Sequence, residues 1–170
     1  MQEKNMFKRL WQHWLHPRWR VERYFPTADL QRISRDIGLS EQQHQGQIRF
    51  VIESRYSSSA VCNHLDTRTR AWQWFGELGV WDTERNSGVL VYLSFADHAV
   101  EIVADRGISA KVNEAEWQQV CQTMLASFKQ DAFVSGLERG LQDVTAILTT
   151  HFPRTEAADF DELPNDVVLR

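Results

Sequence analysis

Apolar side chains near the N-terminus recur at the spacing of an amphipathic helix. The stripe consists of Met6, Phe7, Leu10, Trp11, Trp14, Leu15 and Trp19. Pro17 should end this helix near His16, because proline has no backbone N–H to donate and its ring clashes with the preceding turn. We therefore expect a first helix with one wide, largely aromatic face.

The rest of the chain alternates between helical periods and short apolar runs. Helical spacing covers about 27–43, 64–78, 114–129 and 131–151, and runs of strand length cover 47–54, 89–95 and 100–104. The run at 89–95 is apolar at nearly every position, which is typical of a central strand that is covered on both faces.

These elements predict an α/β fold. The first two strands, joined by a helix, should form a right-handed parallel βαβ unit, and the last two should form an antiparallel hairpin. We expect a three-layer α/β/α sandwich around a small mixed sheet. This domain should span residues 25–153, after a basic amphipathic helix in 1–24 and before an acidic, mostly extended tail in 154–170.

The charge of the chain is unevenly distributed. The 170 residues have a net charge of −4, yet residues 1–24 hold six Lys and Arg against two Glu, and residues 154–170 hold five Asp and Glu against two Arg. The apolar fraction of 42% and the charged fraction of 25% exclude a disordered chain or a fibre. The acidic middle has no basic, aromatic stripe, so we expect no nucleic-acid partner.

The sequence also bears on location. The first thirty residues hold no apolar run that would suit a secretory signal, and the longest apolar stretch is far shorter than the ~20 residues of a membrane-spanning helix. The two cysteines, Cys62 and Cys121, form no C-x-x-C motif. We expect a cytoplasmic protein, with peripheral attachment to the inner membrane as a further possibility.

Acidic and amide side chains gather at one predicted end of the sheet. If the hairpin turn centres on Asp97, Asp105 lies opposite Val89, at the start of the central strand. The set expected at this end is Asp82, Glu84, Asn86, Asp105 and Arg106. Carboxylate and amide oxygens are ligands for calcium or magnesium, so one interpretation is a divalent-cation site and the other is a solvated acidic loop. We expect no organic cofactor, because the sequence holds neither a P-loop nor a G-x-G-x-x-G motif.

The aromatic N-terminal helix is a second candidate for function. Trp11, Trp14 and Trp19 lie in the basic segment, and a basic helix with an aromatic face can lie on an anionic membrane. The same face could instead pack on its own domain, on a second copy or on another protein. The sequence leaves the partner and the oligomeric state open.

An ordered series of segments resembles the TPM domain family over about residues 25–153. The segments are Phe25-Pro26, the strand 48–53, the Trp81 loop with Asn86 and the run 88–92, the strand 100–103, and the stretch 130–137. That family includes thylakoid-lumen and photosystem-assembly proteins and many bacterial proteins. The resemblance implies a three-layer α/β fold, an acid phosphatase activity and a divalent-cation site, often for calcium, near the acidic loop.

Carried onto this sequence, the resemblance implies cation ligands at Asp82, Glu84, Asn86 and, more loosely, Asp131. Asp131 also suits the N-cap of the last helix. The sequence departs from the family where Asn86-Ser87 precedes the glycine of the central strand and where Asp105-Arg106-Gly107-Ile108 follows the hairpin. Arg106 is then either a phosphate contact or the partner of Asp105 in a local ion pair.

Two functions follow as hypotheses. The first is a regulatory or binding module with a divalent-cation site, which meets a protein or a membrane through its N-terminal helix. The second is a weak, cation-dependent acid phosphatase, a hydrolase. We favour the first, because no nucleophile and base can be paired in the sequence.

Overall fold

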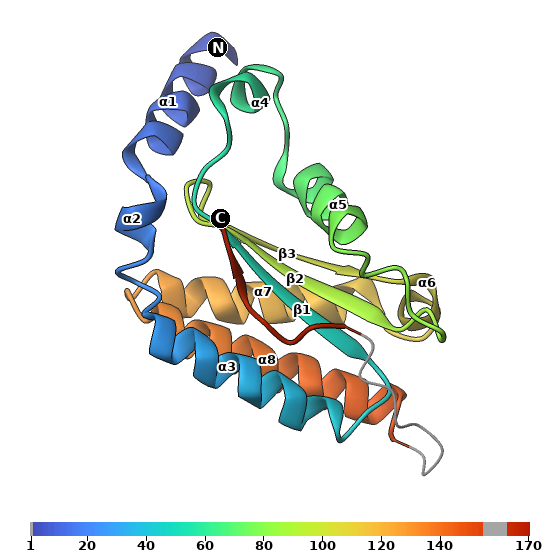
Figure 1. Ribbon diagram of the computed structural model, residues 1–170. Helices are drawn as coiled ribbons and strands as arrows, with labels where there is room; N and C mark the ends of the chain where they lie inside the picture. The colour runs from blue at the N-terminus through green and yellow to red at the C-terminus, as the bar shows by residue number, and fades with distance from the viewer. Residues whose placement is uncertain (1, 155–162) are drawn as a thin grey trace.

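The computed structural model describes residues 2–154 and 163–170, and its centre is an open four-stranded sheet in the order β3-β2-β1-β4 (Figure 1). The strands are β1 (Gln47–Glu53), β2 (Gly88–Ser94), β3 (Ala99–Ala104) and β4 (Val168–Leu169). β1 runs parallel to β2 and β4, and β2 runs antiparallel to β3. The βαβ unit, the hairpin and the α/β sandwich are thus confirmed.

The helices follow the predicted order, with short additions between them. They are α1 (Gln2–Leu15), α2 (Arg18–Val21), α3 (Thr27–Glu41), α4 (Ser58–Cys62), α5 (Thr67–Glu77), α6 (Arg106–Ser109), α7 (Glu114–Phe128) and α8 (Phe133–His151). Pro17 separates α1 from α2, as expected. The helices α2, α4 and α6 were not predicted, because four or five residues are too few to establish a helical period.

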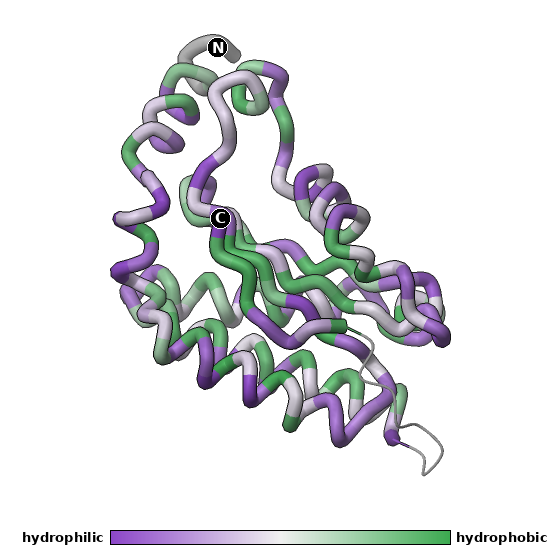
Figure 2. The backbone as a smooth tube through the Cα atoms, in the orientation of Figure 1, coloured by the Kyte–Doolittle hydropathy of each residue, from purple (hydrophilic) through white to green (hydrophobic). Residues whose placement is uncertain are grey.

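Both faces of the sheet are covered. α3, α7 and α8 pack on one face, where Ile48, Phe50 and Ile52 of β1 join their apolar side chains in one core cluster. Residues of β1 and β2 that face the other way, such as Leu90, pack with the α5 side chain of Trp74 in a second cluster. Figure 2 shows the hydrophobic colour running through the central strands. Every residue of β1 and β2 is buried, which confirms the expectation for the central strand.

The hairpin register differs by one residue from the expected one. Val89 pairs with Ala104, and the backbone N–H of Asp105 donates to the carbonyl oxygen of Gly88 at 2.8 Å. The cause is the turn: Ser94 pairs with Ala99, so the connection has an even number of residues and centres before Asp97 rather than on it. Asp105 still lies at the end of the sheet where it was expected.

Two other expectations need correction or completion. Asp131 is not the N-cap of the last helix, because α8 begins at Phe133 with Ala132 as its N-cap, and Asp131 itself has a left-handed φ of 58°. In the acidic tail, residues 155–162 lie outside the described part of the chain. The described end of the tail adds β4 to the sheet, with Val168 beside Val51.

Candidate functional site

Two glycines shape the acidic end of the sheet, where β2 begins and β3 ends. A side chain at Gly88 would put its Cβ 1.9 Å from the carbonyl oxygen of Val80, and a Cβ at Gly107 would lie 2.5 Å from the carbonyl oxygen of Asn86. No Cβ fits at such distances, so only glycine lets α6 and the start of β2 approach the 80–87 loop. The loop and the start of α6 therefore meet as one surface.

Asn86, Asp105 and Arg106 come together on this surface. The Asn86 side-chain oxygen accepts a hydrogen bond from Arg106 Nε at 2.9 Å, and Asn86 has a left-handed φ of 53°. Asp105 caps α6, with its Oδ1 accepting the Arg106 backbone N–H at 2.7 Å. The Arg106 guanidinium thus bonds the Asn86 amide rather than pairing with Asp105.

One oxygen of Asp105 stands out chemically. Its Oδ2 is buried and has no hydrogen-bond partner within residues 2–154 and 163–170, which is costly for a carboxylate and is explained in general by local strain, a functional role, or a bound water or ion. Asn86, which shares Arg106 as a bonding partner with Asp105, adds an amide oxygen, and both are hard oxygen donors that suit calcium or magnesium. The guanidinium of Arg106 competes for the Asn86 oxygen.

The other predicted ligands lie apart. Asp82 and Glu84 are on the same loop as Asn86, and both are exposed. Asp131 lies in the turn between α7 and α8, next to Phe133, whose ring centroid is 5.2 Å from that of Phe95 at the hairpin turn. Asp131 is therefore at the opposite end of the sheet. Within residues 2–154 and 163–170, no three His, Cys, Asp or Glu side chains are grouped so as to hold a metal.

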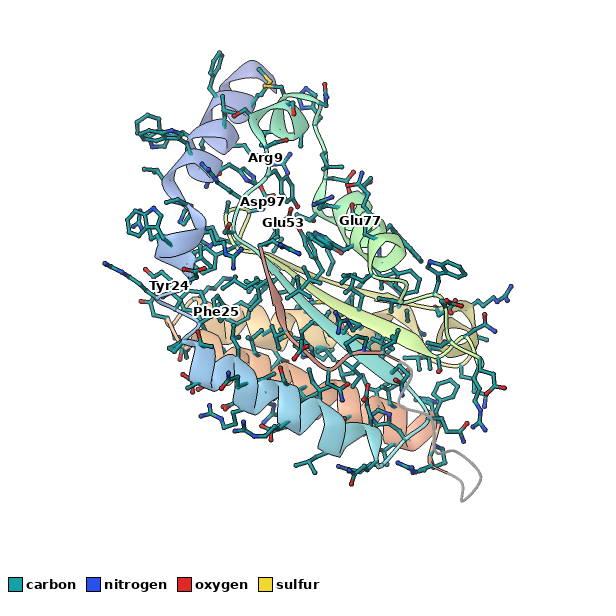
Figure 3. The ribbon with its side chains drawn as sticks, in the orientation of Figure 1. Arg9, Tyr24, Phe25, Glu53, Glu77 and Asp97 are labelled. Carbon is teal, nitrogen blue, oxygen red and sulfur yellow. The ribbon has the colours of Figure 1, made fainter. Side chains whose placement is uncertain are left out.

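The hairpin end of the sheet, where β2 turns into β3, holds the N-terminal helix. Arg9 of α1 donates to both carboxylate oxygens of Asp97, at 2.8 and 3.0 Å, and to the carbonyl oxygen of Leu65 at 2.6 Å. His13 Nε2 lies 3.2 Å from Asp97 Oδ1, and its Nδ1 accepts the backbone N–H of Tyr56 at 2.9 Å. Figure 3 shows Arg9 pointing from α1 towards Asp97. We call Arg9, His13 and Asp97 the polar anchor.

The electrostatics of the polar anchor are strong. Burial alone would raise the pKa of Asp97, but hydrogen bonds from His13 and Arg9 outweigh it and hold that pKa well below its usual range. Ser94 Oγ donates a further hydrogen bond to Asp97 Oδ2 at 3.1 Å. The carboxylate is therefore ionised and saturated with donors, so it serves to hold α1 rather than to bind a ligand.

A second buried carboxylate at the hairpin end is also saturated. Arg70 donates bidentate hydrogen bonds to the Glu53 carboxylate, at 2.9 Å and 2.8 Å. This carboxylate also accepts Trp74 Nε1–H at 2.9 Å and the Tyr92 hydroxyl at 2.7 Å. The Tyr92 oxygen lies 2.9 Å from the Tyr56 hydroxyl, which links this group to the polar anchor. Burial raises the pKa of Tyr56 to about 12 and raises that of Tyr92 further, so both tyrosines remain hydrogen-bonding phenols at neutral pH.

The opposite side of α1 and α2 presents aromatic rings to solvent. Phe7, Trp11, Trp14 and Trp19 are between 60% and 66% exposed, and we call them the aromatic face. The rings of Trp11 and Trp14 lie 5.5 Å apart, so they form one patch. Packing of these tryptophans on their own domain, one of the interpretations of the sequence, is wrong, because polar residues occupy the inward side instead.

The polar anchor was missed at the level of sequence, although a signal for it exists. Arg9, His13 and His16 are spaced by four and three residues, which places them on one side of a helix. The prediction followed the apolar stripe on the other side of the helix instead, because apolar stripes usually face the core. Nothing in the sequence around Asp97, in the hairpin turn, indicates that its partner His13 lies 84 residues earlier.

Comparison with known proteins places the fold in a family. The model of the TPM domain matches residues 21–147, which is most of the chain. The chain belongs to the TPM domain family. The resemblance drawn from the sequence is thereby confirmed, and so is the fold that it implied. No curated protein matches the chain.

Two solved structures are similar to this TPM-domain chain to different degrees. The BA42 protein from the psychrophilic bacterium Bizionia argentinensis is 29% identical, with a TM-score of 0.74 over 85% of this chain and 94% of that one. The N-terminal domain of the cg2496 protein from Corynebacterium glutamicum is 14% identical, with a TM-score of 0.49 over 79% of this chain and 78% of that one. The TPM match begins after the aromatic face, so family membership does not account for that face.

Proposed function

We propose that this TPM-domain chain is a binding module and that the aromatic face is the surface that meets its target. One observation carries the proposal: α1 turns Arg9 and His13 inward, to Asp97, and its largest aromatic side chains outward. A surface helix normally does the reverse. Of the described helices, none is long and apolar enough to cross a membrane. We propose a cytoplasmic location, with peripheral attachment at the inner membrane through the aromatic face.

The energetics favour a covered aromatic face. A Trp or Phe side chain buries about 150–250 Å² when fully covered, and apolar burial contributes roughly 25 cal/mol per Å². Clusters of exposed aromatic rings are uncommon on proteins that have no partner. A target that covers even part of this face gains several kcal/mol, by the same rough conversion.

Site-specific crosslinking tests the binding role. A photoreactive benzoylphenylalanine in place of Trp14 should give a product crosslinked to a protein or to a lipid in cells, detected by gel and by mass spectrometry, and the same replacement at Trp81 should not. Trp81 is a matched control because it is 56% exposed but follows α5 at the other end of the sheet. Equal products at both positions, or none at either, would reject the proposal.

A second candidate function is binding of calcium or magnesium at the acidic end. The buried, unpartnered Oδ2 of Asp105 favours it, with Asn86 as the neighbouring donor and the exposed Asp82 and Glu84 as the outer carboxylates. Asp131 lies at the opposite end of the sheet, so it would have to bind a separate cation. Chemical-shift changes on addition of CaCl2 should map to residues 82–86 and 105–106. Changes that persist in Asp105→Asn would contradict the assignment.

The enzymatic alternative is a weak, cation-dependent acid phosphatase at the same end. A cation there would polarise a phosphoryl oxygen, and Arg106 would contact the phosphate. Hydrolysis of p-nitrophenyl phosphate at acidic pH should then require the cation and fall in Asp82→Ala and Asp105→Ala. Hydrolysis that is unchanged in both variants would exclude the acidic end as the catalytic site.

A further inference from the structure

We infer that the target of the aromatic face is the surface of an anionic lipid bilayer. This inference rests on the proposed binding function and names its partner class. Three observations support it: the charge that surrounds the aromatic face, the kind of side chain that forms it, and the position of the acidic groups of the domain.

The side chains around the aromatic face are mainly basic. Lys8, Arg18, Arg20 and Arg23 on α1, α2 and the turn that follows are exposed. Of these, Arg23 lies over the Trp19 ring, with 5.6 Å from its guanidinium carbon to the ring centroid. The acidic neighbour Glu22 is already paired with Arg18 at 2.8 Å. The surface therefore combines aromatic rings with a net positive charge, which is complementary to anionic headgroups.

The aromatic side chains suit an interface rather than a dry core. Trp combines a large apolar ring with one N–H donor, and such residues concentrate at the level of lipid headgroups. A helix of 14 residues such as α1 is long enough to lie in the plane of the interface with its apolar side inserted. The polar anchor fixes α1 on the domain, so the rings are presented without reordering of the helix.

The position of the acidic end is compatible with an anionic surface. α1 is anchored at the hairpin turn, and the acidic loop lies at the other end of β2 (Figure 1). The seven residues of β2 span about 20 Å at roughly 3.3 Å each. This exceeds the screening length of about 8 Å at physiological salt. The negative charge of Asp82 and Glu84 would therefore be largely screened from the lipid.

A second copy of the chain fits this face less well. A symmetric dimer brings the same patch of each subunit together, so the basic side chains of one copy would be crowded near those of the other. Like charges at short range oppose such an assembly. Each of these side chains instead strengthens binding to an anionic bilayer, and the affinity rises by about fivefold for each basic residue near the surface.

Vesicle co-sedimentation of the full chain tests the inference. The probes are vesicles of phosphatidylcholine with 30% phosphatidylglycerol and vesicles of phosphatidylcholine alone. The unmodified chain should sediment with the first and at least tenfold less with the second. Trp11→Ala/Trp14→Ala should lose at least tenfold in partitioning, and Lys8→Gln/Arg18→Gln/Arg20→Gln should lose about a hundredfold at low salt, a factor that shrinks at high salt. Trp81→Ala should bind like the unmodified chain.

The variants are expected to fold, because all substituted side chains are exposed, and unfolding in urea verifies this. Sedimentation velocity of the chain without lipid separates the two levels of the proposal. Self-association that depends on Trp11 and Trp14, without vesicle binding, would overturn the lipid inference and leave the binding face intact. Equal binding to both kinds of vesicle, or equal binding by the Trp11→Ala/Trp14→Ala variant, would also overturn the lipid inference.

Discussion

The two ends of the sheet treat their carboxylates in opposite ways. At the hairpin end, Glu53 and Asp97 are buried or nearly so, and donors from α5 and α1 saturate them. At the acidic end, Asp105 keeps a buried oxygen that has no partner in the part of the chain that the structure describes, and Asp82 is exposed. The contrast indicates that the carboxylates at the hairpin end hold helices on the sheet, whereas those at the acidic end do not, and the cation site proposed above builds on that difference.

The largest effect should come from Glu53→Gln at the hairpin end. Glu53 is 8% exposed and lies 2.8 Å from Arg70, so neutralising it leaves a largely buried guanidinium without its counter-charge. We expect the free energy of unfolding, measured in urea, to fall by about 3–5 kcal/mol. Glu77→Gln is the matched control, because Glu77 meets the same Arg70 at 3.4 Å but is 53% exposed. A loss of similar size in both variants would mean that burial does not set the contribution.

The next effect is a pH dependence of the free energy of unfolding, caused by a histidine near the acidic end. Burial lowers the pKa of His44, just before β1, to about 4. Between that value and its ordinary 6.5, the unfolded chain binds a proton that the folded chain does not. The free energy of unfolding should therefore fall as the pH drops from 6.5 to 4, by up to about 3 kcal/mol. The hairpin end should not weaken in this window, since Asp97 stays ionised.

Urea unfolding at several pH values checks this expectation. His44→Gln should flatten the pH dependence between 6.5 and 4, and His64→Asn should leave it as it is. His64 is exposed and has a left-handed φ of 56°, a conformation that Asn tolerates. A pH dependence that is the same in all three proteins would show that His44 is not its source.

A smaller effect compares the two ends directly. Asp97→Asn removes the counter-charge of Arg9 and replaces one of the two accepting oxygens with an NH2 group that cannot accept, and should cost about 2 kcal/mol, the range for hydrogen bonds to charged groups. Asp105→Asn keeps an N-cap for α6 and should change the free energy of unfolding by less than about 0.5 kcal/mol. Amide hydrogen exchange should show α1 losing protection in the first variant alone. Equal destabilisation by the two variants would remove the distinction between the ends.

The smallest effect concerns the cation proposed for the acidic end. Arg106 places a positive charge beside Asn86, so Arg106→Gln should strengthen calcium binding, by about five- to tenfold for charges at short range in a solvated site. Arg85→Gln is the control, because Arg85 is exposed on the same loop and donates to Gln45 instead. Isothermal titration with CaCl2 measures both. Unchanged affinity in Arg106→Gln would mean that Arg106 does not compete with the cation.

Much of the fold could be predicted from the sequence, since the local pattern of apolar residues is enough to identify long periodic segments such as α8 and the apolar run of β2. The hairpin register was off by one residue, because it depends on the turn length and not on the strands. β4 was not predicted: Val168 and Leu169 are too short a run, and only their place beside β1 makes them a strand.

The candidate sites show the same distinction between features that local sequence determines and features that depend on distant residues. Asn86, Asp105 and Arg106 could be grouped, because a hairpin fixes which residues share one end of a sheet. Asp131 could not be placed, because its position depends on where α7 ends. The inward turn of Arg9 and His13 depends on a partner far away in the chain, and no local pattern reports such a partner.

One measurement tests the central claim, that polar contacts hold α1 with its aromatic face outward. Burial raises the pKa of the Cys121 thiol to about 12, so a nitroxide label should react selectively with the exposed Cys62 of α4, which packs against α1. In dilute protein, this label should broaden the amide signals of α1 around Leu10, and the broadening should disappear in Asp97→Asn. Sharp α1 signals in the labelled, unmodified chain would contradict the claim.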